Sequence, residues 1–104
     1  VAIEIQQAMP KQGVSSMFKT GMGYGILQGL SVGIGVPYML INPRIWQKQM
    51  FEGMAKDDTK NLSVIVAQRI FPNTDFKATE RCTIIHNGMT DSSLIAEYTR
   101  REII

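Results

Sequence analysis

The stretch from Gly21 to Ile41 most constrains the fold, because it is apolar, uncharged and punctuated by glycines at a regular spacing. A glycine recurs every four residues, at Gly21, Gly25, Gly29 and Gly33. Residues four apart share one face of an α-helix, which turns once every 3.6 residues. Rows of small residues at this spacing are typical of helices that pack closely against another helix in a membrane.

The same stretch has the length of a membrane-spanning helix. About 20 mainly apolar residues cross a hydrocarbon core of about 30 Å. Lys19 and Arg44 flank the uncharged stretch, where long cationic side chains reach the interface. We therefore predict a transmembrane helix over residues 17–41. The aromatic residues near its two ends, as in an interfacial belt, are Tyr24, Tyr38 and Trp46.

The membrane interpretation fixes an expected location and orientation. More lysines and arginines follow the apolar stretch than precede it within the flanking segments. By the positive-inside rule this difference places the C-terminal part on the cytoplasmic or matrix side of a single-pass membrane protein. Gln28, Pro37 and the glycines favour the alternative, in which the stretch is buried core of a soluble domain.

The segments on either side of the apolar stretch are expected to differ in character. Residues 1–16 form an N-terminal arm, and residues 42–60 form an amphipathic helix followed by a polar loop. Pro43 suits the first position of that helix, and Asn42 suits its cap. The helix has an aromatic and methionine face, which we expect to pack as core or to contact the interface or a partner. Its residues are Trp46, Met50, Phe51 and Met54.

Residues 61–104 are expected to form a small α+β module. Leu62–Phe71 is rich in β-branched residues and predicts a strand. Phe76–His86 alternates between apolar and polar residues, and Asn87-Gly88 is a strong hairpin signal. The end of the chain is ambiguous, although Leu94, Ile95 and Tyr98 fit one helical face. The predicted fold class is α+β: a single glycine-zipper transmembrane helix, an amphipathic helix and a C-terminal module containing a β-hairpin.

Few residues of the sequence carry recognisable chemistry. Cys82 and His86, the only cysteine and histidine, would lie roughly 13 Å apart on one strand. Two such residues are too few for a zinc site. The acidic pair Asp57-Asp58 is typical of a solvated loop. The glycines match neither dinucleotide-binding nor P-loop spacing. We expect no catalytic residue, no metal site and no cofactor.

These expectations favour a structural role over an enzymatic one. The predicted protein is an assembly subunit of a larger membrane complex that docks through the glycine face. Its partners are other membrane protein subunits or copies of itself, together with the lipid bilayer. The net charge of +2, from interspersed residues, does not indicate a nucleic-acid partner. The alternative is a soluble α+β binding module or a fragment of a longer chain, with the glycine-rich segment as buried core.

Overall fold

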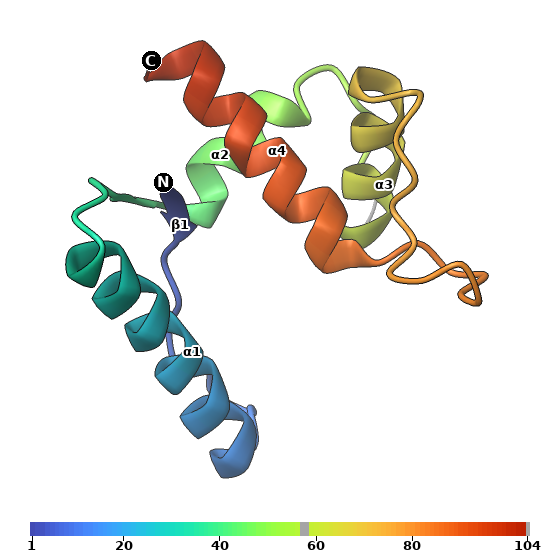
Figure 1. Ribbon diagram of the computed structural model, residues 1–104. Coiled ribbons are helices and arrows are strands. Elements are labelled where there is room, and N and C mark those ends of the chain that lie inside the picture. Colours follow the sequence, from blue (N-terminus) through green and yellow to red (C-terminus); the bar gives the residue numbers. More distant parts are fainter. Residues whose placement is uncertain (57–58, 104) are drawn as a thin grey trace. The chain divides into compact units, whose positions relative to one another are not determined.

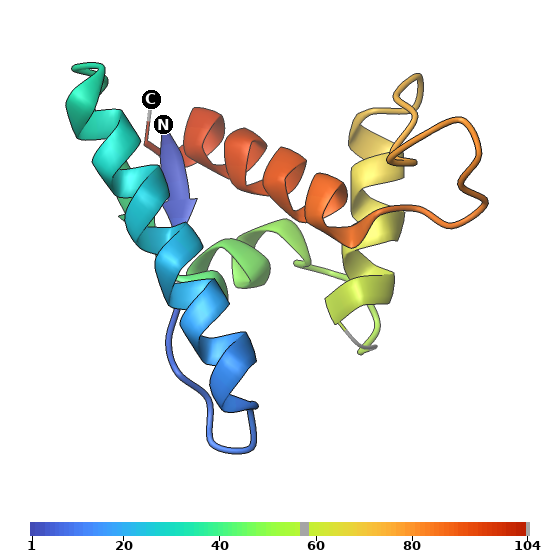
Figure 2. The ribbon, with the colours of Figure 1, turned by 60° about the horizontal axis from the view of Figure 1, so that its bottom comes forward.

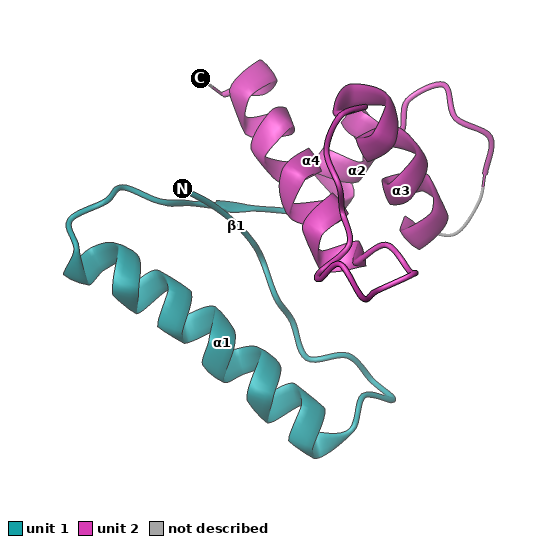
Figure 3. Cartoon of the chain, turned by 45° about the vertical axis from the view of Figure 1, so that its right-hand side comes forward, with its two compact units in different colours: residues 1–43 teal, residues 44–104 magenta. Residues whose placement is uncertain are grey.

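A computed structural model describes residues 1–56 and 59–103. Across these residues the chain has four helices and one two-stranded sheet (Figure 1). It divides into two compact units, residues 1–43 and 44–104, drawn in teal and magenta in Figure 3. We call them unit 1 and unit 2 and describe each by itself.

Unit 1 is a strand–helix–strand element. β1 (Ala2–Glu4) pairs in parallel with β2 (Met39–Ile41), with Ile3 opposite Leu40. Parallel strands need a long crossover connection, which here contains α1 (Val14–Gly33). The backbone pairing extends beyond the strands, since the Met39 N–H donates to the Val1 carbonyl and the Ile5 N–H to the Ile41 carbonyl.

The apolar stretch does not form one continuous helix, which corrects the transmembrane prediction. α1 ends at Gly33, and Gly35 follows with a φ of +74°, a conformation that glycine adopts without strain. The last carbonyls of α1 are satisfied by this turn, because Val36 N–H donates to Ser31 and Gly35 N–H to Val32. The helical part from Gly21 to Gly33 is only about 20 Å long at 1.5 Å per residue.

The predicted single-pass membrane location is also wrong. No helix among residues 1–56 and 59–103 combines the length and apolar character that crossing a bilayer requires. The second half of the stretch becomes a turn and β2, because Gly35 and Pro37 interrupt the helix before Tyr38.

Unit 2 is helical. Its elements are α2 (Pro43–Met50), which begins at the last residue of unit 1, α3 (Thr59–Ile70) and α4 (Asn87–Glu102). α3 and α4 pack against each other, as the two views in Figures 1 and 2 show. The buried apolar residues of this unit are Trp46, Met50, Val66, Ala67, Phe76, Leu94, Ile95 and Tyr98.

The structure also corrects the predicted C-terminal hairpin. Most of Leu62–Phe71 belongs to α3, where Ser63, Val66 and Ala67 are buried at the three-to-four-residue spacing of a helix. Phe76–His86 is a loop in which Phe76 is buried and accepts a hydrogen bond from His86 N–H. Asn87-Gly88 begins α4 instead of turning a hairpin, because His86 caps the helix just before it. Tertiary packing of α3 on α4 overrides the local β preference.

Candidate functional site

The face that α1 turns toward its own unit is mostly polar. Its covered residues are Met17, Thr20, Tyr24, Gln28 and Ser31, spaced three and four apart. α1, all of whose residues are described, buries only Ser31, whose hydroxyl donates to the Leu27 carbonyl. On this side the Tyr38 hydroxyl donates to Gln28 Oε1 at 3.4 Å.

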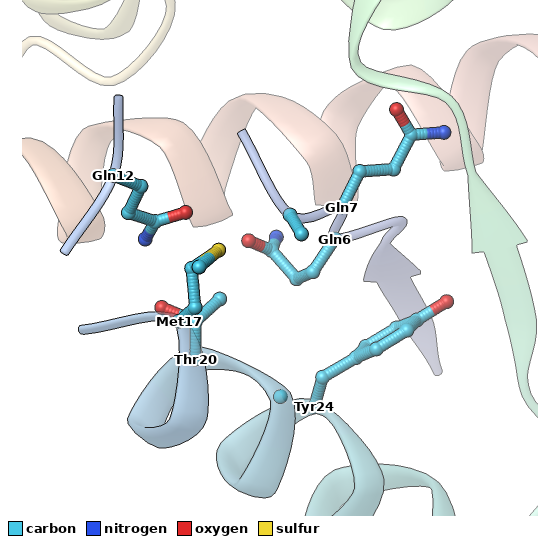
Figure 4. A pocket seen from close by; sticks show the side chains of 8 residues that line it. Gln6, Gln7, Gln12, Met17, Thr20 and Tyr24 are labelled. Carbon is cyan, nitrogen blue, oxygen red and sulfur yellow. The ribbon is translucent and has the colours of Figure 1, made fainter. Parts of the chain in front are cut away.

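A small hollow lies beside the first turns of this inner face. Its volume is about 160 Å³, and glutamines from the segment between β1 and α1 surround it together with Met17, Thr20 and Tyr24 (Figure 4). The walls carry amides and hydroxyls but no charged side chain. The hollow therefore lies between the polar face of α1 and the preceding segment, and its polar walls are uncharged.

The opposite, outer face of α1 is apolar and exposed. Four large side chains form an i, i+4 row there, with exposed fractions of 50 % to 70 %. We call Phe18, Met22, Ile26 and Leu30 the large row. Leu27 and Val32 are also exposed. A helix on a globular unit ordinarily turns its apolar stripe inward, so the arrangement in α1 is the reverse.

The predicted packing glycines run alongside the large row. Gly21, Gly25, Gly29 and Gly33 are all exposed, and at each of them no described atom lies within 4 Å of the position that a Cβ would take. The four glycines, which we call the glycine row, thus form an open strip of backbone. Nothing in unit 1 fills it.

The aromatic and methionine face predicted for residues 42–60 lies partly in the core. Trp46 is fully buried and Met50 is 7 % exposed, while Phe51 and Met54 are half-buried. The Trp46 and Phe51 rings meet edge to face, with centroids 5.7 Å apart. The acidic pair at positions 57 and 58 lies outside the described residues.

A buried polar cluster joins α3 to α4. The Ser63 hydroxyl lies 2.5 Å from Asp91 Oδ1 and 2.9 Å from Thr90 Oγ1, and Thr90 in turn donates to the Asn87 carbonyl. Ser63 and Thr90 are completely buried. A serine hydroxyl with no solvent access cannot meet a substrate, so this cluster holds two helices together and does not form a nucleophilic site.

Cys82 and His86 make separate local contacts. Cys82 lies in the loop 3.2 Å from the Thr79 hydroxyl, and that hydrogen bond lowers the pKa of the thiol below its usual value. His86 caps α4 through its ring. Among the described residues no three His, Cys, Asp or Glu side chains gather as metal ligands would.

The basic pair at the end of α4 is engaged with a carboxylate. Arg100 and Arg101 both form ion pairs with Glu97, at 2.5 Å and 2.9 Å. The hydrogen bonds from Arg100 and then Arg101 lower the pKa of Glu97 to about 2. Each of these residues already has a partner on its own helix, which favours a stabilising role for the cluster.

Sequence reasoning identified the glycine row but missed which face of α1 turns inward. The signal was present, because Thr20, Tyr24, Gln28 and Ser31 are spaced as one polar helical stripe. The contact between Ser63 and Asp91 could not be predicted from a local pattern, since the two residues come from segments far apart in the sequence.

Comparison with known proteins adds no further assignment. No protein-family model, no curated protein and no solved structure matches this sequence.

Proposed function

We propose that this chain is a protein-binding module that associates with a second copy of itself through the outer face of α1. The observation that carries this proposal is the reversed polarity of α1. The helix turns Thr20, Tyr24 and Gln28 toward its own unit and leaves the large row and the glycine row exposed. Exposed apolar surface gathered in one place is a general mark of an interaction site.

The chemistry of this face favours a second copy as the occupant. α1 has no charged residue after Lys19, so a charged partner surface would lose its hydration there without gaining an ion pair. Another α1 presents a matching uncharged surface. A two-fold interface uses the same patch on both chains, so the patch must be self-complementary.

The two rows of α1 supply that complementarity. The large row lies beside the glycine row, displaced by one residue along the sequence. In a two-fold pair, side chains such as Met22 and Ile26 of one copy can enter the strip left open by Gly25 and Gly29 of the other. The open space at each glycine supports such a close approach of two backbones.

The test is the oligomeric state of the purified chain, measured by sedimentation velocity over a range of concentrations. We expect a reversible dimer, and we expect Gly25→Leu and Gly29→Leu to shift it to monomer by filling the strip. Gly23→Leu is the matched control. Gly23 is an exposed glycine of the same helix with equally open surroundings, but it lies outside the glycine row, on the other side of the large row.

The comparison separates docking from helix stability. All three substitutions remove a helical glycine and raise helix propensity by a similar amount. Only the two variants in the glycine row should therefore lose association. A monomeric parent chain, or equal association of all three variants, would contradict the proposal.

A further inference from the structure

The imidazole of His86 closes the N-terminus of α4. His86 has an extended backbone, with φ −82° and ψ 113°, and its Nδ1 accepts a hydrogen bond from the Met89 N–H at 3.3 Å. Its carbonyl accepts from the Met89 and Thr90 N–H groups. Serine, threonine, aspartate and asparagine usually hold this position, so a titratable ring is an unusual cap.

Gly88 makes room for this ring. A Cβ placed on Gly88 would lie 2.8 Å from the imidazole Cε1 and 3.1 Å from Nδ1. A side chain at position 88 would therefore push the ring away from the Met89 N–H. Among the glycines of the chain, all of them described, only Gly88 has a neighbour this close.

The capped end of α4 is also the end that meets α3. Thr90 and Asp91 contact Ser63 of α3, and Asn87 Nδ2 donates to the Lys60 carbonyl at 3.4 Å. Loss of the cap would loosen the first turn of α4, where these contacts begin.

The cap depends on the charge of the ring. A neutral imidazole with its proton on Nε2 has a lone pair on Nδ1, whereas a protonated ring has N–H groups at both positions and accepts nothing. The protonated ring would also place a positive charge at the N-terminus of α4, which is the positive end of the helix dipole. Histidine changes charge between pH 5 and 8. We infer that His86 is a pH-sensitive cap that holds the start of α4 against α3 at neutral pH and releases it on acidification.

Charged residues from α3, from α4 and from the loop around Phe76 belong to the same region as His86. On α3 this residue is Lys60, whose backbone carbonyl accepts the hydrogen bond from Asn87. On α4 it is Asp91, which accepts a hydrogen bond from the Ser63 hydroxyl. The loop that carries Phe76 also contributes charged residues of both signs. These are Asp75, Lys77, Glu80 and Arg81.

The experiment compares urea unfolding of the full chain at pH 7.5 and pH 5.0 with that of His86→Asn. Fluorescence of Trp46, the single tryptophan and fully buried in unit 2, reports the transition. Asparagine caps helices without titrating, so the variant retains an acceptor at both pH values. Acidification should lower the folded-to-unfolded ratio of the parent roughly fivefold more than that of the variant, as expected for one lost cap.

Two further experiments test whether the His86 ring acts as a pH-sensitive cap. Nitrogen NMR of the His86 ring at pH 7.5 should show the proton on Nε2. Gly88→Ala should displace the ring and remove the extra acid sensitivity. A proton on Nδ1, equal acid sensitivity of parent and His86→Asn, or full acid sensitivity in Gly88→Ala would each overturn the inference.

Discussion

At the scale of single residues, a short polar contact lies where two helices meet. Ser63 is fully buried on α3 and faces Asp91 and Thr90 of α4. A hydrogen bond to a charged acceptor is stronger than one between neutral groups, and the half-buried Asp91 carboxylate would regain only part of its hydration if it lost this donor. Ser63 therefore fixes the pairing of the helices more firmly than its size suggests.

Replacing this serine tests that role. We expect Ser63→Ala to lower the free energy of unfolding of unit 2 by about 1–3 kcal/mol, because the Asp91 carboxylate loses its donor. Urea unfolding followed by Trp46 fluorescence measures the change. The control is Ser92→Ala, since the exposed Ser92 donates only within α4, to the Met89 carbonyl. Equal effects of the two substitutions would show that the buried contact contributes nothing special.

At the scale of elements, the ending of α1 explains why the apolar stretch does not form one continuous helix. The chain leaves the helix at Gly33 and turns at Gly35, whose φ of +74° suits glycine and strains other residues. The turn redirects the chain into β2, so that two parallel strands can pair. A single backbone conformation thus divides one apolar segment into a helix and a strand.

The turn at Gly35 can be tested against a neighbouring glycine. We expect Gly35→Ala to destabilise unit 1 by about 1 kcal/mol because alanine is strained at positive φ. Gly33→Ala should be neutral or stabilising, because Gly33 is helical and has open space around it. Thermal unfolding followed by far-ultraviolet circular dichroism compares the two. If both variants melted alike, the special role of the Gly35 conformation would be refuted.

The end of α4 gives a prediction about pH. Arg100 and Arg101 hold the pKa of Glu97 near 2, below its ordinary value, so the carboxylate stabilises the fold at neutral pH. That contribution is present above the ordinary value and is lost as the pH falls toward about 2. Glu97→Gln should therefore be less stable than the parent at pH 7, and the difference should be clearly smaller at pH 2.5 and close only below about pH 2.

Urea midpoints at the two pH values measure this gap. Glu102→Gln is the control, because Glu102 is an exposed residue of the same helix. A gap for Glu97→Gln that stayed constant with pH would contradict the role of the ion pairs.

The sequence predicts an element correctly when residues within or next to that element determine it, and not when contacts with distant segments do. Pro43 after Asn42 marks the start of α2 locally, and the break near Pro37 follows from its missing N–H. The β-branched run within Leu62–Phe71 favours a strand by local preference, yet α3 forms because Ser63, Val66 and Ala67 pack on α4. Asn87-Gly88 likewise resembles a hairpin turn until His86 is seen to cap a helix. Such tertiary contacts are not visible in a short window of sequence.

At the scale of the whole molecule, the two units differ in the number of buried apolar side chains that they contain. Unit 2 holds most of the buried apolar side chains, among them Trp46, Val66 and Leu94. In the described part of unit 1, the buried apolar residues are Ile3 and Ile41. Burial of apolar area is the main source of folding free energy, so the units should differ in stability when separated.

Separate expression tests this difference. We expect residues 42–104, which keep Asn42 and Pro43 at the start of α2, to fold alone with a buried Trp46 and a cooperative urea transition. Residues 1–43 alone should show little cooperative structure. Fluorescence and circular dichroism distinguish the outcomes, and an unfolded 42–104 fragment would refute the expectation.

The parallel pairing of β1 with β2 also bears on how the chain matures during synthesis. β1 leaves the ribosome first, but its partner is made only after the whole of α1, since Ala2 pairs with Met39. Closing a loop of that length costs on the order of 3 kcal/mol of chain entropy before any strand bond is gained. The first strand must therefore wait unpaired while α1 is translated, and this interval is when a nascent chain would need protection from neighbours.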